Sequence, residues 1–527
     1  MAQNVAQYGS SKIPGVPEPS FPNAYSEFDK ARLRSYKLYE DLYFTNTEDY
    51  KVILRGQDAE GNEQNRPVYI PNAQKIVEGK LGYLCKGFKL TPNKTNTQVD
   101  DYITKLLKRE NWDLKLRSQN RWKLVRGDSH WYITADENKP EGSRISIHEL
   151  DPSTFYPIED DEDRMIGCYI VDEVPLPGGK KGEVCARVQK YWRPTDNDGN
   201  LVPDADIKYK SELYETGKWD ERNLDAKDLK VISTEEPEKD LPGIKSLPVY
   251  RDRNNPPQNG VFGRSELAGL EALIIDVNQM MTDEELTLIM HGLGVFATSA
   301  GAPRDSAGNI VPWQISPLTV IEHGTNDKFY RVEGVGSVQP MQDHMKYADS
   351  QIQQTVGLSD MALGVVDSAT AESGIALQLK LGPTIVSNIE KQDVTKSVLA
   401  QMFYDLIRFW LPAFESISDP GEDYDVEITF EDPMPVNREK RFEQLMALWD
   451  ASLISAKKIT EELSKILGFE LTEADFKAAI EDKKSMAIAT DPLYASMGQD
   501  AANAGIQDPN AQNASGGAAG AAGATGA

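Results

Sequence analysis

The stretch that decides the fold runs from Val261 to Gly292 and reads VFGRSELAGLEALIIDVNQMMTDEELTLIMHG. Its apolar residues recur mostly at every third or fourth position, namely Leu267, Leu270, Ile274, Val277, Met281 and Leu288. This spacing predicts one long amphipathic helix over residues 262–292, with a single apolar stripe. The acids of the stretch fall on its other faces, at Asp276, Asp283, Glu284 and Glu285.

A second long helical run follows at residues 372–411, and a small β-rich insert separates the two runs. Gly382 and Pro383 stand inside the second run. Proline removes an intrahelical hydrogen bond and clashes with the turn before it, so we expect a kink there. Two long helices around a small insert suit a ring with a central channel better than a compact enzyme domain.

The composition is that of a large acidic protein. Its 527 residues exceed what one hydrophobic core usually serves, so we expect several structural regions. The net charge of −26 argues against a bulk surface that clamps DNA, because phosphate binding requires lysine and arginine. It stays compatible with DNA that passes nearby without adhering, or with a local basic patch.

The cysteines and the chain ends indicate a reducing cytosol. Cys85, Cys168 and Cys185 match neither a zinc pattern nor a disulfide framework, so we expect them to be reduced and buried. We expect neither a signal peptide nor a membrane span, since the N-terminus lacks an apolar core and no apolar run is long enough. Residues 1–24 are expected to form a flexible arm, and residues 485–527 a disordered low-complexity tail.

Other elements follow from the same periodicities. Helices are expected over residues 26–44, from Asn72 as an N-cap, and over 96–110, 112–125, 339–356, 438–451, 457–467 and 473–483. Thr472 and Asp475 resemble a capping box for the last of these. Period-two alternation predicts strands in residues 129–251, at HWYIT, RISIHEL, IGCYIVDEV, CARVQKYW and IKYKSELYE. More strands are expected in GVFATSAG, PWQISPLTVIEHG, DKFYRVEG and DVEITFEDP.

The sequence offers no catalytic constellation. A phosphate loop, an HExxH helix and a GxSxG elbow are all missing, and the five histidines are scattered singly. The acidic run at 159–163 lacks the glycine and the spacing of a calcium loop, so we interpret it as a solvated turn. The aromatics Trp122, Trp131, Tyr132, Tyr191 and Trp192 are expected in the core rather than as base-stacking platforms. We therefore expect no metal, no cofactor and no enzymatic activity.

The order of elements resembles the portal proteins of tailed bacteriophages, from about Ser26 to Lys483. The most specific part is 347–381, YADSQIQQTVGLSDMALGVVDSATAESGIALQLKL, in which a helix ends in a small-residue loop and restarts at a Ser/Thr/Glu-rich cap. The GxSEL approach to the first long helix, the GVFATSAGAP segment after it and the LDPSTFYPI segment are also similar to the family.

The resemblance implies an α+β portal fold, with wing, stem, clip and crown regions and long stem helices around a central channel. It also implies a tunnel loop that faces DNA in this channel. The regions are an N-terminal arm (1–24), the wing (25–262), a stem helix (263–292), the clip (293–337), a second stem helix (338–357), the tunnel loop (358–372), a kinked long helix with a wing strand (373–432), the crown (433–484) and the tail (485–527).

The function that the resemblance implies is a ring of twelve copies at one capsid vertex, through which double-stranded DNA is packaged and ejected. The implied partners are the terminase large subunit, a head–tail connector or adaptor, and the major capsid and scaffolding proteins. The protein would be assembled in the host cytoplasm and reside in the virion. Twelve copies at −26 carry a formal charge of roughly −310, and an acidic channel wall would repel phosphate so that DNA slides.

The resemblance also gives individual residues expected roles. The tunnel-loop residues expected to face DNA are Leu358, Asp360, Met361, Gly364, Asp367, Ser368 and Thr370. Lys346 and Lys380 flank this loop and are candidate DNA-guiding cations, with a solvated helix surface as the alternative for each. The apolar stripe of the first stem helix is expected to pack against neighbouring subunits, because a closed ring needs heterologous contacts.

Two other classes of protein stay open at this point. One is another virion structural protein, such as a head–tail adaptor or a minor capsid protein, although such adaptors are usually shorter. The other is a metal hydrolase that combines Asp161, Asp163 and a distant histidine.

Overall fold

The computed structural model describes residues 27–46, 67–159, 164–181, 183–196, 201–215, 231–256, 261–293, 295–311, 325–332, 338–359, 363, 374–431, 438–451, 453–467 and most of 471–481. The chain forms two compact units, Met1–Met434 and Pro435–Ala527. Helices and strands occur mostly in separate runs along the chain, so the fold class is α+β, as predicted.

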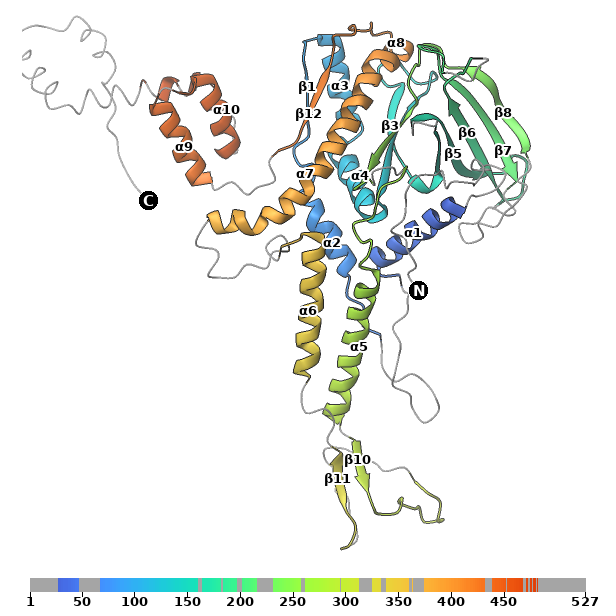
Figure 1. Cartoon of the computed structure of the whole chain (residues 1–527), viewed down its shortest axis with the longest axis vertical. Coiled ribbons are helices and arrows are strands. Elements are labelled where there is room, and N and C mark those ends of the chain that lie inside the picture. The colour runs from blue at the N-terminus through green and yellow to red at the C-terminus, as the bar shows by residue number, and fades with distance from the viewer. Residues whose placement is uncertain are drawn as a thin grey trace, which may run out of the picture. The chain divides into compact units, whose positions relative to one another are not determined.

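The first unit holds most of the elements (Figure 1). Its helices are α1 (Glu27–Phe44), α2 (Asn72–Leu81), α3 (Thr97–Arg109), α4 (Trp112–Arg126), η1 (Pro152–Thr154), α5 (Glu271–Leu293), α6 (Gln339–Val356), α7 (Gly374–Asp405), η3 (Leu406–Trp410) and α8 (Leu411–Phe414). Its strands are β1 (Lys89–Pro92), β2 (Asp128–Ala135), β3 (Ile145–Leu150), β4 (Phe155–Glu159), β5 (Met165–Pro175), β6 (Val184–Trp192), β7 (Lys208–Glu215), β8 (Val231–Asp240), β9 (Val249–Arg253), β10 (Val295–Thr298), β11 (Phe329–Val332) and β12 (Val426–Thr429).

The helical periodicities of the sequence locate α1, α3, α4 and α6 to within one or two residues. Asn96 caps α3 through its side chain, which accepts a hydrogen bond from the Val99 amide. The prediction of Asn72 as an N-cap is wrong, because Asn72 is the first helical residue of α2 and Pro71 holds the cap position. Asn72 is buried, and no side chain caps the start of α2.

Two antiparallel sheets form the β-rich region. One has five strands in the order β4-β5-β6-β7-β8, and the other has three strands in the order β3-β2-β9. The strands predicted from alternation are β2, β3, β5, β6 and β7. The strands β4, β8 and β9 were not predicted. β8 reads VISTEEPEKD and is exposed along nearly its whole length, so it carries no alternation, and β9 follows directly on a proline.

The main core joins helices and strands that are far apart in sequence. Trp112 of α4 stacks on Trp131 of β2 with ring centroids 4.8 Å apart, and Phe403 of α7 meets Trp112 edge-on at 5.4 Å. β1 pairs with β12, which ties the segment after α2 to the segment after α8. Of the aromatic residues predicted in the core, Trp131 and Tyr191 are buried in it, and Trp122 and Tyr132 are half-buried against it. Trp192 is half-buried but does not belong to this core.

The helix predicted over residues 262–292 begins later than expected, at Glu271. The residues before it form turns because they lie against other backbone. The Ser265 hydroxyl donates to the Val125 carbonyl at 2.5 Å, and the Glu266 amide donates to the Leu124 carbonyl at 2.9 Å. A Cβ on Gly263 would lie 2.2 Å from the Gly127 carbonyl oxygen, so this segment passes too close to α4 for any side chain at this position.

The helices α5 and α6 run side by side (Figure 1). Ile274 and Val277 near the start of α5 and Ile352 and Val356 near the end of α6 belong to one buried cluster, so the two helices are antiparallel. Farther along, the amide of Gln342 donates to the buried Glu284 carboxylate at 2.7 Å. The hairpin of β10 and β11 lies between the two helices in sequence, and the predicted strand in 312–324 is outside the described residues.

The second long helical run extends from α7 through η3 to α8, that is, from Gly374 to Phe414. Pro383 lies inside α7, as predicted, and Figure 1 shows that α7 changes direction along its length. A π-helical turn at 406–410 precedes Pro412, which also has no amide to donate.

The second unit has a small core of its own. α9 (Arg438–Asp450) and α10 (Ala456–Leu467) pack through Leu445, Ile459 and Leu463. The predicted capping box is confirmed, since the Thr472 amide donates to the Asp475 carboxylate at 3.0 Å and the Asp475 amide donates to the Thr472 hydroxyl at 3.2 Å. The whole N-terminal arm and the whole tail lie outside the described residues.

A candidate functional site at the helix junction

The described residues contain no metal-binding cluster. No group of three or more histidine, cysteine or acidic side chains within them is placed to hold a metal. The acidic residues 160–163 lie outside the described part, and Glu159 forms an ion pair with Arg251 at 2.5 Å. None of the described helices is long and apolar enough to cross a membrane. The three cysteines are free and buried, as predicted.

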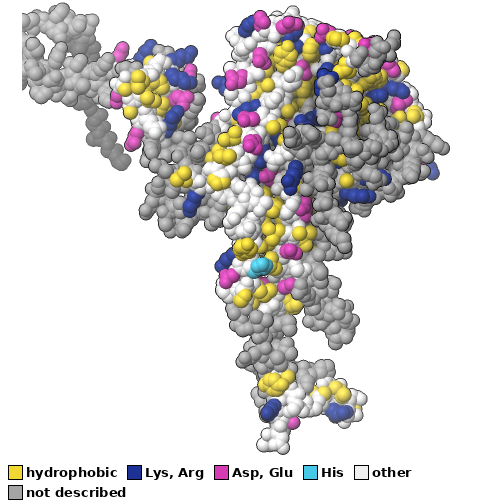
Figure 2. All heavy atoms as spheres, viewed as in Figure 1, with side chains coloured by type: hydrophobic (Ala, Val, Ile, Leu, Met, Phe, Trp, Pro, Cys, Tyr) yellow, Lys and Arg dark blue, Asp and Glu magenta, His cyan; other side chains and the backbone are white. Residues whose placement is uncertain are grey.

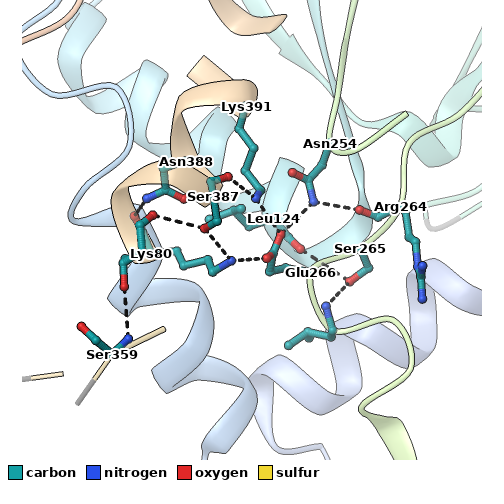
Figure 3. A network of polar contacts seen from close by, with 12 residues as sticks. Lys80, Leu124, Asn254, Arg264, Ser265, Glu266, Ser359, Ser387, Asn388 and Lys391 are labelled. Carbon is teal, nitrogen blue, oxygen red and sulfur yellow. Dashed lines mark hydrogen bonds and ion pairs between the residues drawn. The ribbon is translucent and has the colours of Figure 1, made fainter. Parts of the chain in front are cut away.

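A buried network of polar contacts lies where α2, α7 and the approach to α5 meet, and we call it the helix junction (Figure 3). The Lys80 ammonium of α2 forms an ion pair with Glu266 and donates to the Ser387 hydroxyl of α7 at 3.2 Å. Lys391 of α7 lies 3.5 Å from the other oxygen of Glu266. The Asn254 amide donates to this oxygen at 3.1 Å, so one carboxylate joins three segments of the chain.

A second buried ion pair extends the junction to α4 and β9. The Lys123 ammonium lies 2.5 Å from Asp252, and neither side chain is exposed to solvent. Lys123 also donates to the Thr395 hydroxyl of α7 at 2.7 Å, and Thr395 donates to Asp252 at 3.0 Å. The junction thus contains three buried cations and two buried anions. The cations are Lys80, Lys123 and Lys391, and the anions are Asp252 and Glu266.

The charges of the junction depend on one another. Burial opposes the charge on Glu266, but the ammonium groups of Lys80 and Lys391 outweigh it and lower the pKa of Glu266 below its usual range. Burial lowers the pKa of Lys391; Glu266 opposes this shift, and the Lys80 charge adds to it. Burying unpaired charges is costly, so each of these side chains requires its partners in place. The junction therefore fixes the register among α2, α7 and the approach to α5.

The end of α6 is attached to the same junction. Gly357 terminates α6 in the left-handed conformation at a φ of 65°, and the Ser359 amide donates to the Thr384 hydroxyl just beyond Pro383 at 3.1 Å. A Cβ on Gly79 of α2 would lie 3.3 Å from Leu358 and 3.1 Å from Leu363, so both leucines pack on α2. The segment that leaves α6 is therefore held between α2 and the turn of α7 after its proline.

The structure describes only part of the predicted tunnel loop. Leu358 is buried against α2. The other predicted loop residues lie outside the described residues, namely Asp360, Met361, Gly364, Asp367, Ser368 and Thr370. Lys346 on α6 and Lys380 on α7 are both exposed, and Pro383 lies at the outer surface of α7, with Gly382 half-buried beside it.

The predicted stem stripe divides into two parts. Leu267, Leu270, Ile274 and Val277 are buried within one chain, and the first two precede the helix. Met281 is half-buried and Leu288 is exposed. Of the acids on the other faces, Glu284 is buried against Gln342, whereas Asp276 is exposed. The stripe thus serves the protomer core near the junction and reaches the surface farther along.

Sequence reasoning did not identify the junction. Its lysines stand in ordinary helical contexts, such as Lys123 beside Leu124 and Lys80 beside Leu81, where a lysine is usually solvated. One signal was present, because Ser265 and Glu266 belong to the GxSEL segment that resembles the portal family. Its partners lie on segments far away in sequence, so spacing alone could not bring them together.

The comparisons with known proteins assign this architecture to a class. The chain belongs to the phage portal proteins, a structural and non-enzymatic family. The family model that matches is described as "Phage portal protein, SPP1 Gp6-like", and it covers residues 24–486. No curated protein matches the chain.

Several solved structures contain similar chains. One is from the virion of a native gene transfer agent (GTA) particle, at 12% identity and a TM-score of 0.40, covering 77% of this chain and 96% of that chain. Another is from the neck of the native GTA particle computed with C12 symmetry, at 13% identity, a TM-score of 0.40 and the same coverage. A third is from the neck of the empty GTA particle computed with C6 symmetry, at 14% identity and a TM-score of 0.41, covering 79% and 98%. The identities and TM-scores of these three structures are low, so the assignment to the portal family rests on the family model alone.

Proposed function

We propose that this chain is the subunit of a closed ring at one vertex of a phage capsid, through which double-stranded DNA is packaged and later ejected. The observation that carries the proposal is the path of the chain around the helix junction. α5 begins beside the junction, α6 returns to it antiparallel, and the β10–β11 hairpin lies between them in sequence. A pair of antiparallel helices held at one end by the helix junction could form part of the wall of a channel.

In this proposal the α5–α6 pair is the stem, and the hairpin within 293–337 is the clip. The body of the first unit is the wing, 358–372 is the tunnel loop, and 433–484 is the crown. Leu288, Ile289 and Tyr347 are large apolar side chains on α5 and α6 that stay exposed on a single chain. Burial of such side chains on association favours assembly, so they are candidate contacts between neighbouring stems.

The charge of the chain supports passage of DNA rather than its capture. A net charge of −26 per copy disfavours tight binding to phosphate, and a ring of twelve multiplies it. Lys346 and Lys380 are exposed on α6 and α7, the helices that flank the proposed tunnel loop, where a few cations would guide a duplex without holding it. The terminase would supply the motive force and dock at the clip, and a head–tail connector would take the same position later.

Negative-stain microscopy of the purified full-length chain tests this proposal. We expect closed rings with a central channel, and image classification should give one rotational symmetry with twelve copies. Rings should persist when salt is varied, because the proposed stem contacts are apolar and are screened little by ions. Monomers or open filaments at every salt concentration would refute the proposal.

A further inference from the structure

Two exposed helix faces lie on opposite sides of the pair of helices α4 and α7, and their proposed role rests on the ring proposed above. On α7, Leu379, Val386 and Ile389 are exposed, Leu379 by 75% and Val386 by 65%. Pro383 lies between them and is exposed as well. Figure 2 shows exposed apolar side chains over this part of the chain. Such a run of apolar surface is costly in water unless another surface covers it.

The second face belongs to α4. Leu114 is 71% exposed there. Trp122, about two turns further along, is half-buried and has the Arg126 guanidinium over its ring. Phe44, at the end of α1, is also exposed and extends the apolar area, with its ring centroid 6.0 Å from that of Trp122. Arg117 lies on this face with its side chain largely exposed.

The contact between Lys123 and Thr395 shows how the two faces are related. Lys123 of α4 donates to Thr395 of α7 at 2.7 Å, so these two residues mark where the helices meet. Leu114 precedes Lys123 by nine positions, and Val386 precedes Thr395 by nine positions. At about 100° per residue, nine positions correspond to roughly two and a half turns, which leaves the two residues on opposite sides of their helix. Each exposed residue therefore points away from the other helix. The two apolar faces therefore point in opposite directions, one on the outer side of α7 and one on the outer side of α4.

Each face carries exposed charges of both signs, Lys380 beside Leu379 on α7 and Asp113 beside Leu114 on α4 included, but the residues that follow the apolar ones differ in sign. Glu390 and Asp393 follow the apolar residues on the outer side of α7, and both are exposed. Asp393 has an ion pair with Lys396, but that pair is largely solvated and therefore weak. Arg117 on α4 lies 3.8 Å from Glu78 at an equally exposed site. An acid-edged apolar face and an arginine-edged apolar face on one chain are complementary in both respects.

We propose that the outer face of α7 packs against the outer face of α4 of a neighbouring copy of this chain. A ring requires contacts in which two different patches of the same subunit meet, and a patch on each side of this pair of helices meets this requirement. Leu379, Val386 and Ile389 would lie against Leu114, Trp122 and Phe44 of the neighbour. Glu390 and Asp393 would lie near Arg117.

Assembly of a substituted chain tests the α7 half of the proposal. Val386→Asp places a carboxylate in the contact, and we expect at least about a tenfold rise in the concentration needed for rings, measured by mass photometry. Val202→Asp is the matched control, because Val202 is exposed but lies on neither face. Both variants should show the far-ultraviolet circular dichroism of the wild-type chain. Equal assembly of the two variants would overturn the proposal.

Cysteine cross-linking tests the pairing with α4. The native cysteines are buried, and burial raises the pKa of the Cys85 and Cys168 thiols to about 12, so they should react slowly. Rings of the double variant Val386→Cys with Leu114→Cys should give a ladder of covalent oligomers with a short bismaleimide. Each single variant should give no ladder, and neither should Val202→Cys combined with Leu114→Cys.

The outcomes separate this inference from the proposed function. If the wild-type chain forms no rings, both are wrong. If it forms rings, Val386→Asp assembles like Val202→Asp and no ladder appears, only this inference is wrong. If Val386→Asp prevents assembly but intact rings of the double-cysteine variant give no ladder, α4 is not the counterpart and the pairing is overturned.

Discussion

The pair of Lys123 and Asp252 is the most deeply buried ion pair of the helix junction. Neither side chain is exposed to solvent, and both bond to Thr395 of α7. Removing two charges from water is expensive, and their attraction offsets this cost only when the geometry and the additional hydrogen bonds are right. The pair therefore contributes mainly to specificity, because α4, β9 and α7 must all be in register before it is satisfied.

Removal of one partner should therefore lower the free energy of unfolding substantially. Lys123→Met leaves Asp252 buried without a counter-charge and should lower the free energy of unfolding by about 3–5 kcal/mol. The double variant Lys123→Met with Asp252→Leu should recover much of this loss. Lys94→Met is the surface control, since the pair of Lys94 with Asp423 is well exposed and should contribute less than about 1 kcal/mol. Urea unfolding of the three variants measures these differences, and equal losses for Lys123→Met and Lys94→Met would contradict the assignment.

At the residue scale the sequence predicts the exposed and apolar residues better than the buried polar ones. It predicted that Cys85, Cys168 and Cys185 are buried and unpaired, and this is confirmed. It gave no role to Lys80 or Lys391, because a lysine in a helix is normally solvated and its burial depends on partners more than a hundred residues away. The helix junction is thus a property of the tertiary fold.

At the element scale, helices were located well wherever apolar residues recur with the helical period. α6 occupies residues 339–356, as predicted, because its apolar face is continuous. The start of α5 was wrong by nine residues, from 262 to 271. The apolar spacing continues through the approach, but contact with the α4 backbone overrides the local preference for a helix. β8 was missed because solvent covers both of its faces, and a strand without a buried face shows no alternation.

Two glycines should respond in opposite directions to substitution by alanine. Gly263→Ala would place a methyl group 2.2 Å from the Gly127 carbonyl oxygen, so the approach to α5 must shift, and we expect a loss of about 2 kcal/mol or more in unfolding free energy. Gly382→Ala lies within α7 with nothing within 4 Å of the new Cβ, and it should gain up to about 1 kcal/mol from helix propensity. Thermal unfolding measures both. A stabilised Gly263→Ala would show that the close approach is not rigid.

At the scale of the whole molecule, the chain consists of two units with separate cores. The large core draws on residues up to Phe430, and the small core of α9 and α10 is built around Leu445, Ile459 and Leu463. A core of this size provides little stability alone, because a short segment buries too small a part of its surface. The second unit should therefore unfold more readily than the first.

Truncation at residue 434 tests this separation. A chain that ends at Met434 should keep the main unfolding transition of the full chain, with a change in midpoint of less than about 2 °C, because it retains every residue of the large core. Differential scanning calorimetry of the two chains gives the comparison. A main transition that moves down by more than about 5 °C would show that the large core depends on residues beyond 434.

The sequence also predicted the class of the molecule, because the order of its elements resembles the portal family and the family model confirms it. The residues of the proposed tunnel loop could be named from the sequence only through that resemblance. Their function depends on which other copies surround them. No periodicity within one chain carries this information, so their roles stay predictions.

The edge strand β8 has a consequence for solubility. It lies at the end of the five-stranded sheet and carries Glu235, Glu236 and Glu238 around Pro237. An open strand edge can recruit the edge of another molecule, and clustered carboxylates together with a proline block this reaction. A protein present in many identical copies can aggregate when the open strand edges of different copies pair with one another. We expect this acidic border to disfavour pairing between the sheets of two copies.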